Sequence, residues 1–377
     1  MVELVRSLRG QPLWTVSGAA VLLALAVLPF FLNGYGQQVM MIGYFYVMLG
    51  ISWNILAGYT GQFALAQHAF ATIGAYVSAA MALGFAASLP CYLQFPGFYI
   101  PLPCALAAVT VHLPLPLSIA VGTLVAALLG YGLGWVTLGM RGVYFAISTW
   151  AFAESVRILL SINYKITRGD MGLPVPYLFD TPDPFPYYYV FFVASVLTLV
   201  LNAAMLRMKI GYRMRAIRDD QELAVASGVD VVKWKRLVFM LSTALAGLAG
   251  ALYGHSIGLL TPSQAHFSQM AFVVIAVVLG GFRTLWGPVI GALLAQGLAE
   301  ALRFSAEWRF VIFALLVIVI VRVYPPGIMG FIYAAVERLR RRAAPDRPRP
   351  AAVPIHGFHP LRSPDAAASE SGAAEQN

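Results

Sequence analysis

A polar stretch inside an apolar part of the chain holds the first residues whose types suggest chemistry. Residues 58–76 read GYTGQFALAQHAFATIGAY, where amides and an imidazole lie among alanines and aromatic side chains. If this stretch is helical from Gly61 onward, one face is small and polar, with His68 on its edge and Gln67 roughly opposite. The residues on that face are Gln62, Leu65, Ala69, Thr72 and Tyr76.

Hydrogen bonding is the chemistry that such a face offers. A polar group in hydrocarbon without a partner costs several kcal/mol, so the face must look into the protein or into water. Two interpretations stay open at this point. The side chains either join neighbouring helices by hydrogen bonds, or they line a pathway through the membrane.

A second group of residues adds charge. Glu154 and Arg157 in AFAESVRILL lie three residues apart, so on a helix they are neighbours on one face and can neutralise each other. If this helix runs outward, Arg157 lies about 9 Å from its outer end at 1.5 Å per residue, close enough to reach the interface. The pair either holds the helix bundle together or contacts what passes along it.

Catalytic and metal-binding chemistry find little support. An enzyme within the membrane needs a nucleophile with a positioned base or a metal, and His68, His255 and His266 have no recognisable partner. ATP hydrolysis through a phosphate-binding loop needs a Gly-Lys pair ahead of Ser or Thr, and the lysines here follow Tyr, Met, Val and Trp. These lysines are Lys165, Lys209, Lys233 and Lys235. We therefore expect neither an enzyme nor a cofactor bound by this chain.

The elements that must position these residues are membrane-spanning helices. The chain has 377 residues, of which 60% are apolar and only 11% charged, far from the composition of a soluble domain. Uncharged runs of about 20 residues, the length that crosses a hydrocarbon core, recur along it. We expect an all-α polytopic membrane protein with about ten transmembrane helices, within a range of about 8 to 10. The predicted spans are 13–32, 39–57, 62–83, 114–137, 143–163, 187–206, 237–258, 267–281, 286–302 and 309–324.

One apolar segment, residues 89–113, is harder to assign because it contains several prolines. We interpret it as an external or re-entrant segment, with a further span as the main alternative. Cys91 and Cys104 both lie within it, and either a disulfide or two unpaired thiols fits their positions. The eighth and ninth spans are short, so a re-entrant or tilted path also fits them.

The formal charge of +9 is distributed as membrane topology requires. Lys and Arg lie in short loops beside apolar spans rather than in a nucleic-acid-binding patch, so we exclude nucleic acid as a partner. With the N-terminus inside, about ten spans place Arg141, Arg283 and the loop 207–236 on the cytoplasmic side. We expect a transmembrane domain in residues 1–336 and a basic, disordered cytoplasmic tail in residues 337–377.

The loop of residues 207–236, called the charged loop below, predicts a short capped helix between basic flanks. Asp219 or Asp220 can cap its N-terminus, Glu222 suits its first turn, Ala226 continues it, and Gly228 is placed to end it. The flanking cations alone would keep the loop inside the cell. The capped helix is what a groove on a partner protein would need.

Several motifs together resemble a known family. The chain is similar from about residue 39 to 333 to the membrane subunit of branched-chain amino-acid ABC importers, the M-type permease. The motifs are GYTGQFALAQHAFATIGAY, AFAESVR, ITRGDMGL, RAIRDDQELAVASGVDVVKWK with LSTALAGLAGALYGHSIG, and VVLGGFRTLWGPVIGA.

This resemblance implies a mechanism and a set of partners. The helix from Asp219 to Gly228 would be the coupling helix that seats in a cleft of a cytoplasmic ATPase, and the spans around Gln62 and Glu154 would flank the translocation path. ATP would be used by partner subunits. The resemblance also implies a second permease subunit, homologous or identical, an external substrate-binding protein, and a place in the bacterial inner membrane with both termini cytoplasmic.

The cargo implied is a branched-chain or other hydrophobic amino acid. This chain reads ALAQH at residues 64–68, where the family commonly has Ser-Leu-Gly followed by His or Gln. The alternative is therefore the same architecture carrying urea or short amides. A second alternative is an ion-coupled secondary transporter, for which Glu154 is the candidate titrating group.

Overall fold

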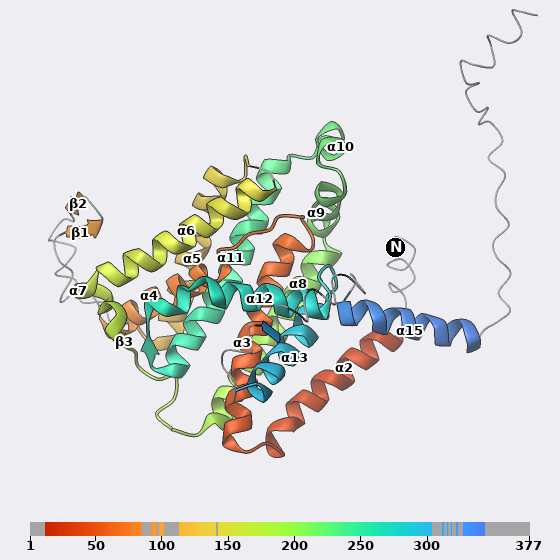
Figure 1. Cartoon of the computed structure of the whole chain (residues 1–377), viewed down its shortest axis with the longest axis horizontal. Helices are drawn as coiled ribbons and strands as arrows, with labels where there is room; N and C mark the ends of the chain where they lie inside the picture. The colour runs from red at the N-terminus through yellow and green to blue at the C-terminus, as the bar shows by residue number, and fades with distance from the viewer. Residues whose placement is uncertain are drawn as a thin grey trace, which may run out of the picture. The chain divides into compact units, whose positions relative to one another are not determined.

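The computed structural model describes most of the chain as helices. The described residues are 12–84, 92–95, 98–101, 113–140, 142–303 and 327–343, with isolated positions between 311 and 322. The chain divides into two compact units, Met1–Ile332 and Tyr333–Asn377. The longer helices (Figure 1) are α2 (Pro12–Val27), α3 (Gly34–Ala57), α4 (Gln67–Leu83), α5 (Leu115–Thr137), α6 (Val143–Ile162), α8 (Pro184–Arg207), α9 (Lys209–Asp219), α11 (Val231–Ile257), α12 (Phe267–Gly280), α13 (Gly287–Ala301) and α15 (Gly327–Ala343).

Short elements connect these helices. Two antiparallel ribbons occur, one pairing β1 with β2 and one pairing β3 with β4. The short elements are η2 (Leu28–Phe30), β1 (Tyr92–Phe95), β2 (Phe98–Pro101), α7 (Tyr164–Thr167), η5 (Gly169–Met171), β3 (Leu173–Pro174), α10 (Gln221–Ala226), β4 (Leu259–Leu260) and η6 (Pro262–Ala265).

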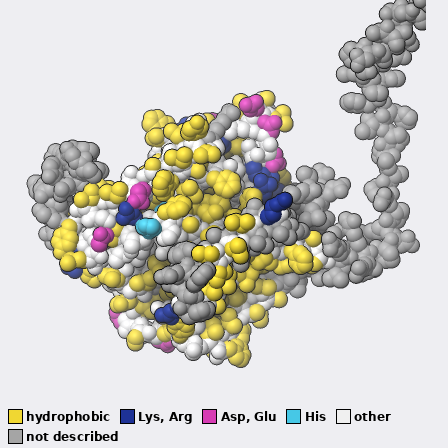
Figure 2. Space-filling view, viewed as in Figure 1, with side chains coloured by type: hydrophobic (Ala, Val, Ile, Leu, Met, Phe, Trp, Pro, Cys, Tyr) yellow, Lys and Arg dark blue, Asp and Glu magenta, His cyan; other side chains and the backbone are white. Residues whose placement is uncertain are grey.

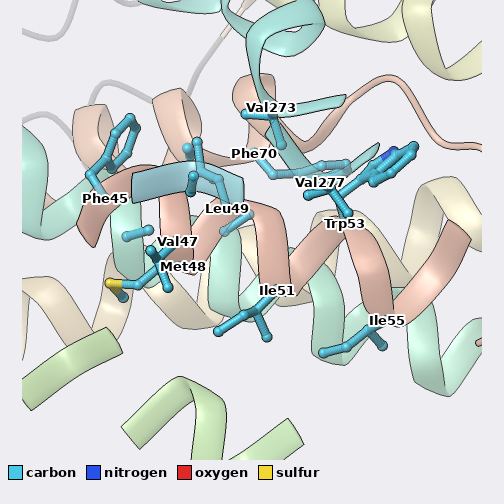
Figure 3. Close-up of a cluster of buried hydrophobic side chains, with 14 of the residues drawn as sticks. Phe45, Val47, Met48, Leu49, Ile51, Trp53, Ile55, Phe70, Val273 and Val277 are labelled. Carbon is cyan, nitrogen blue, oxygen red and sulfur yellow. The ribbon is translucent and has the colours of Figure 1, made fainter. Parts of the chain in front are cut away.

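Helix α3 is central to the first unit. It packs against α8, α13, α11 and α12, and its side chains point into the core on all sides (Figure 3). Met48, Ile51 and Trp53 are completely buried. A helix that is apolar around its whole circumference is buried on all faces, because no face of it can be offered to water.

Five of the described helices are long and apolar enough to cross a membrane: α3, α5, α6, α8 and α11, with 20 to 27 residues each. At 1.5 Å per residue they span about 30 to 40 Å, the thickness of a hydrocarbon core. Large apolar side chains such as Leu128, Trp135 and Leu197 are exposed on α5 and α8. Figure 2 shows such side chains spread over the molecular surface, as expected of a protein surrounded by lipid.

Small residues allow α4, α5 and α11 to approach closely. A Cβ atom on Gly74 would collide with the backbone of Gly247, one on Gly122 with the carbonyl oxygen of Gly74, and one on Gly250 with the backbone of Ala71. Backbones this close give membrane helices their van der Waals contact. These three helices therefore pack closely against one another.

Each predicted span from the first to the ninth coincides with a described helix, within a few residues at most ends. The start of the third span is wrong. Residues 61–66 are not helical, and α4 begins at Gln67. The predicted grouping of Gln62 and Leu65 on one face of α4 is therefore wrong as well. The tenth span, 309–324, lies largely outside the described residues.

Two further predictions need correction or stay open. Residues 92–95 and 98–101 form an antiparallel hairpin in which Tyr92 lies opposite Pro101, which is not the helix that a span through 89–113 requires. Cys91 and Cys104 lie outside the described residues. Helix α15 continues to Ala343, so the predicted disordered tail begins with a helical segment. The domain boundary at residue 336 stays a prediction.

Candidate functional site

Helix α10 confirms the capped helix predicted in the charged loop. The Asp220 carboxylate accepts hydrogen bonds from the backbone N–H groups of Glu222 and Leu223, at 2.9 and 3.0 Å. Asp220 is therefore the N-cap, and Asp219 ends the preceding helix α9. Gly228 has φ of +79°, the left-handed conformation that commonly follows a helix and that glycine adopts without strain.

A small core braces α10 against its neighbours. Ala224 is buried on α10 and packs with Ile217 of α9 and Val231 of α11. The Lys235 Nζ atom donates a hydrogen bond of 2.9 Å to Gln221 Oε1, which ties α11 to the start of α10. A helix of six residues is too short to be stable alone, so these contacts hold it in place.

The outer surface of α10 carries apolar side chains that the sequence analysis did not single out. Leu223 is 64% exposed and Val225 is 57% exposed, on either side of the buried Ala224. Glu222, Ala226 and Gly228 are exposed too. Figure 1 shows α10 at the tip of a protrusion beyond the other helices. We call α10 with residues 227 and 228 the knob. Exposed apolar groups on a rigid protrusion are typical of a docking surface.

Basic side chains of α9 contact the neighbouring helices α8 and α11. The Arg213 guanidinium lies over the Trp234 ring, 4.2 Å from its centroid. Arg215 donates hydrogen bonds to the carbonyl oxygens of Leu206 and Gly211, at 2.8 and 3.1 Å. These contacts connect α9 to α11 and to the end of α8, so the basic flanks of the loop have structural roles besides their charge.

Inside the bundle, Gln67 joins three helices. Its Nε2 atom donates to Ser242 Oγ of α11 at 3.0 Å. The hydroxyl of Ser242 donates to the Ser52 carbonyl of α3, and that of Ser52 donates to the Ser242 carbonyl, both at 2.7 Å. For Gln67 the structure thus agrees with the interpretation as a hydrogen-bonding link between helices.

His68 and Thr72 face a small cavity between α3, α4, α11 and the segment that begins α12. His68 is 3% exposed, and its Nδ1 atom has no hydrogen-bond partner among the described residues. The cavity has a volume of about 30 Å³, enough for one or two water molecules and far too little for an amino acid. Its other polar lining residues are Tyr46, Tyr253, Gln264 and Gln269.

Glu154 and Arg157 form the ion pair that their spacing predicts. Arg157 Nε and Nη2 donate to Glu154 Oε1 at 2.9 and 2.5 Å. About a third of each side chain is exposed, 34% for Glu154 and 29% for Arg157. Glu154 also lies within electrostatic range of His68 and His266. The pair on α6 is therefore partly accessible at the molecular surface, and neither residue lines the cavity.

The predicted pathway residues do not all come together. His68 and Thr72 line one cavity, whose lining does not include Glu154 or Arg157. Tyr76 instead packs in a separate cluster with Leu173 and Leu260 of the β3–β4 ribbon. Gln62 precedes α4 and is 7% exposed. The structure therefore brings His68 and Thr72 together at the cavity, places the Glu154–Arg157 pair on α6 outside its lining, and leaves Gln62 and Tyr76 away from it.

Comparison with known proteins agrees with the family resemblance seen in the sequence motifs. The family described as "Branched-chain amino acid transport system / permease component" matches residues 37–321. The high-affinity branched-chain amino acid transport system permease protein LivM of Escherichia coli is 28% identical over 351 residues, covering 84% of this chain and 76% of that protein.

Two other relatives cover less of the chain. The permease protein LivH of the same transport system in Escherichia coli is 30% identical over 194 residues, 47% of this chain and 62% of that protein. The fructose import permease protein FrcC of Rhizobium meliloti is 27% identical over 215 residues, 53% of this chain and 59% of that protein. No solved structure matches the chain.

Proposed function

The chain belongs to the permease-component family of branched-chain amino acid transport systems, and from this premise we propose that it carries a branched-chain or other hydrophobic amino acid into the cell. It is a multi-pass membrane permease of the ABC importer type, and its family is one of transport proteins rather than enzymes. The proposed cargo follows the printed function of the LivM and LivH relatives.

The observation that carries the proposal of ATP-driven import is the knob. The chain would bind no nucleotide itself, and ATP would be hydrolysed by cytoplasmic ATPase subunits. The capped helix α10, its buried Ala224 and its exposed Leu223 and Val225 form a rigid protrusion of the kind that a groove on such a subunit can hold. Closure of the ATPase pair would then bias the helices between inward-open and outward-open forms.

The same proposal assigns the polar group around His68 to the translocation path. The cavity lined by His68 and Thr72 is too small for any amino acid. This supports a state in which the translocation path is closed at the position of these two residues. Glu154 and Arg157 on α6 would flank the path from a partly exposed face. Gln62 and Tyr76 remain candidates by resemblance alone, because neither contacts the cavity.

The partners proposed are those of a complete importer. They are a second permease subunit, homologous or identical, an external substrate-binding protein, and the ATPases. The relatives LivM and LivH are named as permease proteins of one kind of transport system, which supports a pair of unlike permeases. The proposed location is the bacterial inner membrane, with both termini and the charged loop in the cytoplasm.

Transport into proteoliposomes tests the proposal. The complete importer is reconstituted with its binding protein outside and ATP inside, and uptake of radiolabelled leucine is measured. We expect uptake that requires ATP and that unlabelled valine and isoleucine compete away. Competition by urea or acetamide but not by valine would replace the proposed cargo. Uptake without ATP, driven by a sodium or proton gradient, would contradict the mechanism.

A further inference from the structure

Arg218, at the end of α9, connects the knob to a distant part of the chain. Its Nε and Nη2 atoms donate to the Asp219 carboxylate at 2.9 and 2.8 Å, directly before the residue that caps α10. Its Nη1 atom donates to the carbonyl oxygen of Gly58 at 3.2 Å. One planar guanidinium with several donors can hold both partners at once.

Gly58 begins the α3–α4 linker, which we define as residues 58–66. The linker is irregular, and a Cβ atom on Gly61 would lie 3.3 Å from Arg218 Cγ, so the linker lies against the aliphatic part of that side chain. Trp53 Nε1 of α3 donates to the carbonyl oxygen of Ala64 at 2.8 Å. Figure 1 shows the linker as a non-helical segment between the end of α3 and the start of α4.

The other end of the linker touches both helices that carry the candidate path residues. The backbone N–H of Leu65 donates to Thr149 Oγ1 of α6 at 3.0 Å. Two residues later α4 begins, with His68 in its first turn. Glu154 lies five residues beyond Thr149, about one and a half turns along α6. A displacement of the linker would therefore reach both α4 and α6.

The contacts of the linker can carry a displacement from one helix to the next. Non-helical backbone at the edge of a membrane bundle is kept where neighbouring side chains satisfy its polar groups. Here Arg218, Trp53 and Thr149 do so from α9, α3 and α6. Tyr59, Ala64 and Ala66 of the linker are also buried in the core, so a displacement of Gly58 would be passed along a closely packed segment to the start of α4 and to α6.

We infer that Arg218 and the α3–α4 linker transmit movement of the knob to α4 and α6. This inference rests on the proposed function, because it assumes that an ATPase moves the knob. Arg218 is a positioning residue: it acts through Gly58 and does not belong to the exposed surface of α10. The competing route runs from α9 to α11 through Arg213 and Trp234, and Arg213→Gln is therefore the matched control.

The test uses the complete importer in proteoliposomes and measures three quantities: co-purification of the ATPases, ATP hydrolysis, and leucine taken up per ATP hydrolysed. Arg218→Gln should keep the first two and lower uptake per ATP by about fivefold or more, the lower end of the coupling found between linked sites. Thr149→Val, which removes the acceptor of the Leu65 N–H on α6, should act in the same direction. Arg213→Gln should leave uptake per ATP unchanged.

Three results would overturn the inference. One is normal uptake per ATP in Arg218→Gln. Another is loss of ATPase co-purification in a folded Arg218→Gln protein, since this would place the residue in the docking surface. The third is normal uptake per ATP in Thr149→Val, which decides the matter if Arg218→Gln does not fold. Failure of the unmodified importer to take up leucine with ATP would instead reject the proposed function.

Discussion

Replacing the two exposed apolar residues of the knob should weaken its binding to an ATPase without harming the fold. Leu223 and Val225 are 64% and 57% exposed. Complete burial of such a side chain contributes roughly 1.5 to 3 kcal/mol, so the exposed part of each offers about 1 to 2 kcal/mol to a partner. For the double variant Leu223→Ser with Val225→Ser, we expect a loss of about 2 to 4 kcal/mol, or roughly 30-fold to 1,000-fold in affinity.

The assay compares ATPase retained on the purified permease, leucine uptake, and the thermal unfolding midpoint. Uptake and retention should fall together, while unfolding changes little because the substituted positions are on the surface. Val232→Ser is the matched control, since Val232 is 42% exposed in the same loop but lies on α11. Unchanged ATPase retention in the double variant would refute the assignment of the knob as the docking surface.

Three other perturbations follow from the same structure. Glu222→Arg with Gly228→Trp should abolish uptake while the protein stays folded in the membrane; normal uptake with normal ATPase retention would count against docking. Import should be insensitive to proton and sodium gradients, and a collapse of uptake on adding a protonophore at fixed ATP would favour an ion-coupled carrier. Gly250→Ala should lower stability by about 1 to 3 kcal/mol, because its Cβ would collide with the Ala71 backbone. The control Gly132→Ala has no atom within 4 Å, and an equal drop in the unfolding midpoint of both variants would contradict the packing argument.

The helices of the bundle were predictable because their signal is strong and local. An uncharged run of about 20 residues has few alternatives to a membrane helix, and α5, α6 and α8 begin and end close to the predicted residues. The cap of α10 was predictable for a similar reason, since Asp220 needs only the N–H groups of the next turn. That Asp220 rather than Asp219 is the N-cap could be decided only from the backbone structure, in which Asp219 ends α9.

The predictions that failed concern segments whose structure depends on contacts with residues distant in the sequence. Residues 61–66 are apolar enough to continue a helix, but they are irregular, and Trp53 of α3 and Thr149 of α6 hydrogen-bond their backbone. Arg218 of α9 does the same at Gly58, just before them. Leu223 and Val225 are exposed only because Ala224 between them is the side chain that fits between α9 and α11. Neither arrangement follows from local periodicity, because tertiary contacts override it.

Cross-linking from the knob tests the central claim most directly. A photoreactive amino acid is placed at position 223 or 225 in the intact importer, with position 232 as the control, and the products of irradiation are identified. The account predicts a covalent adduct between the permease and an ATPase subunit from positions 223 and 225, and little from position 232. Adducts to lipid or to the permease itself, with none to an ATPase, would contradict it.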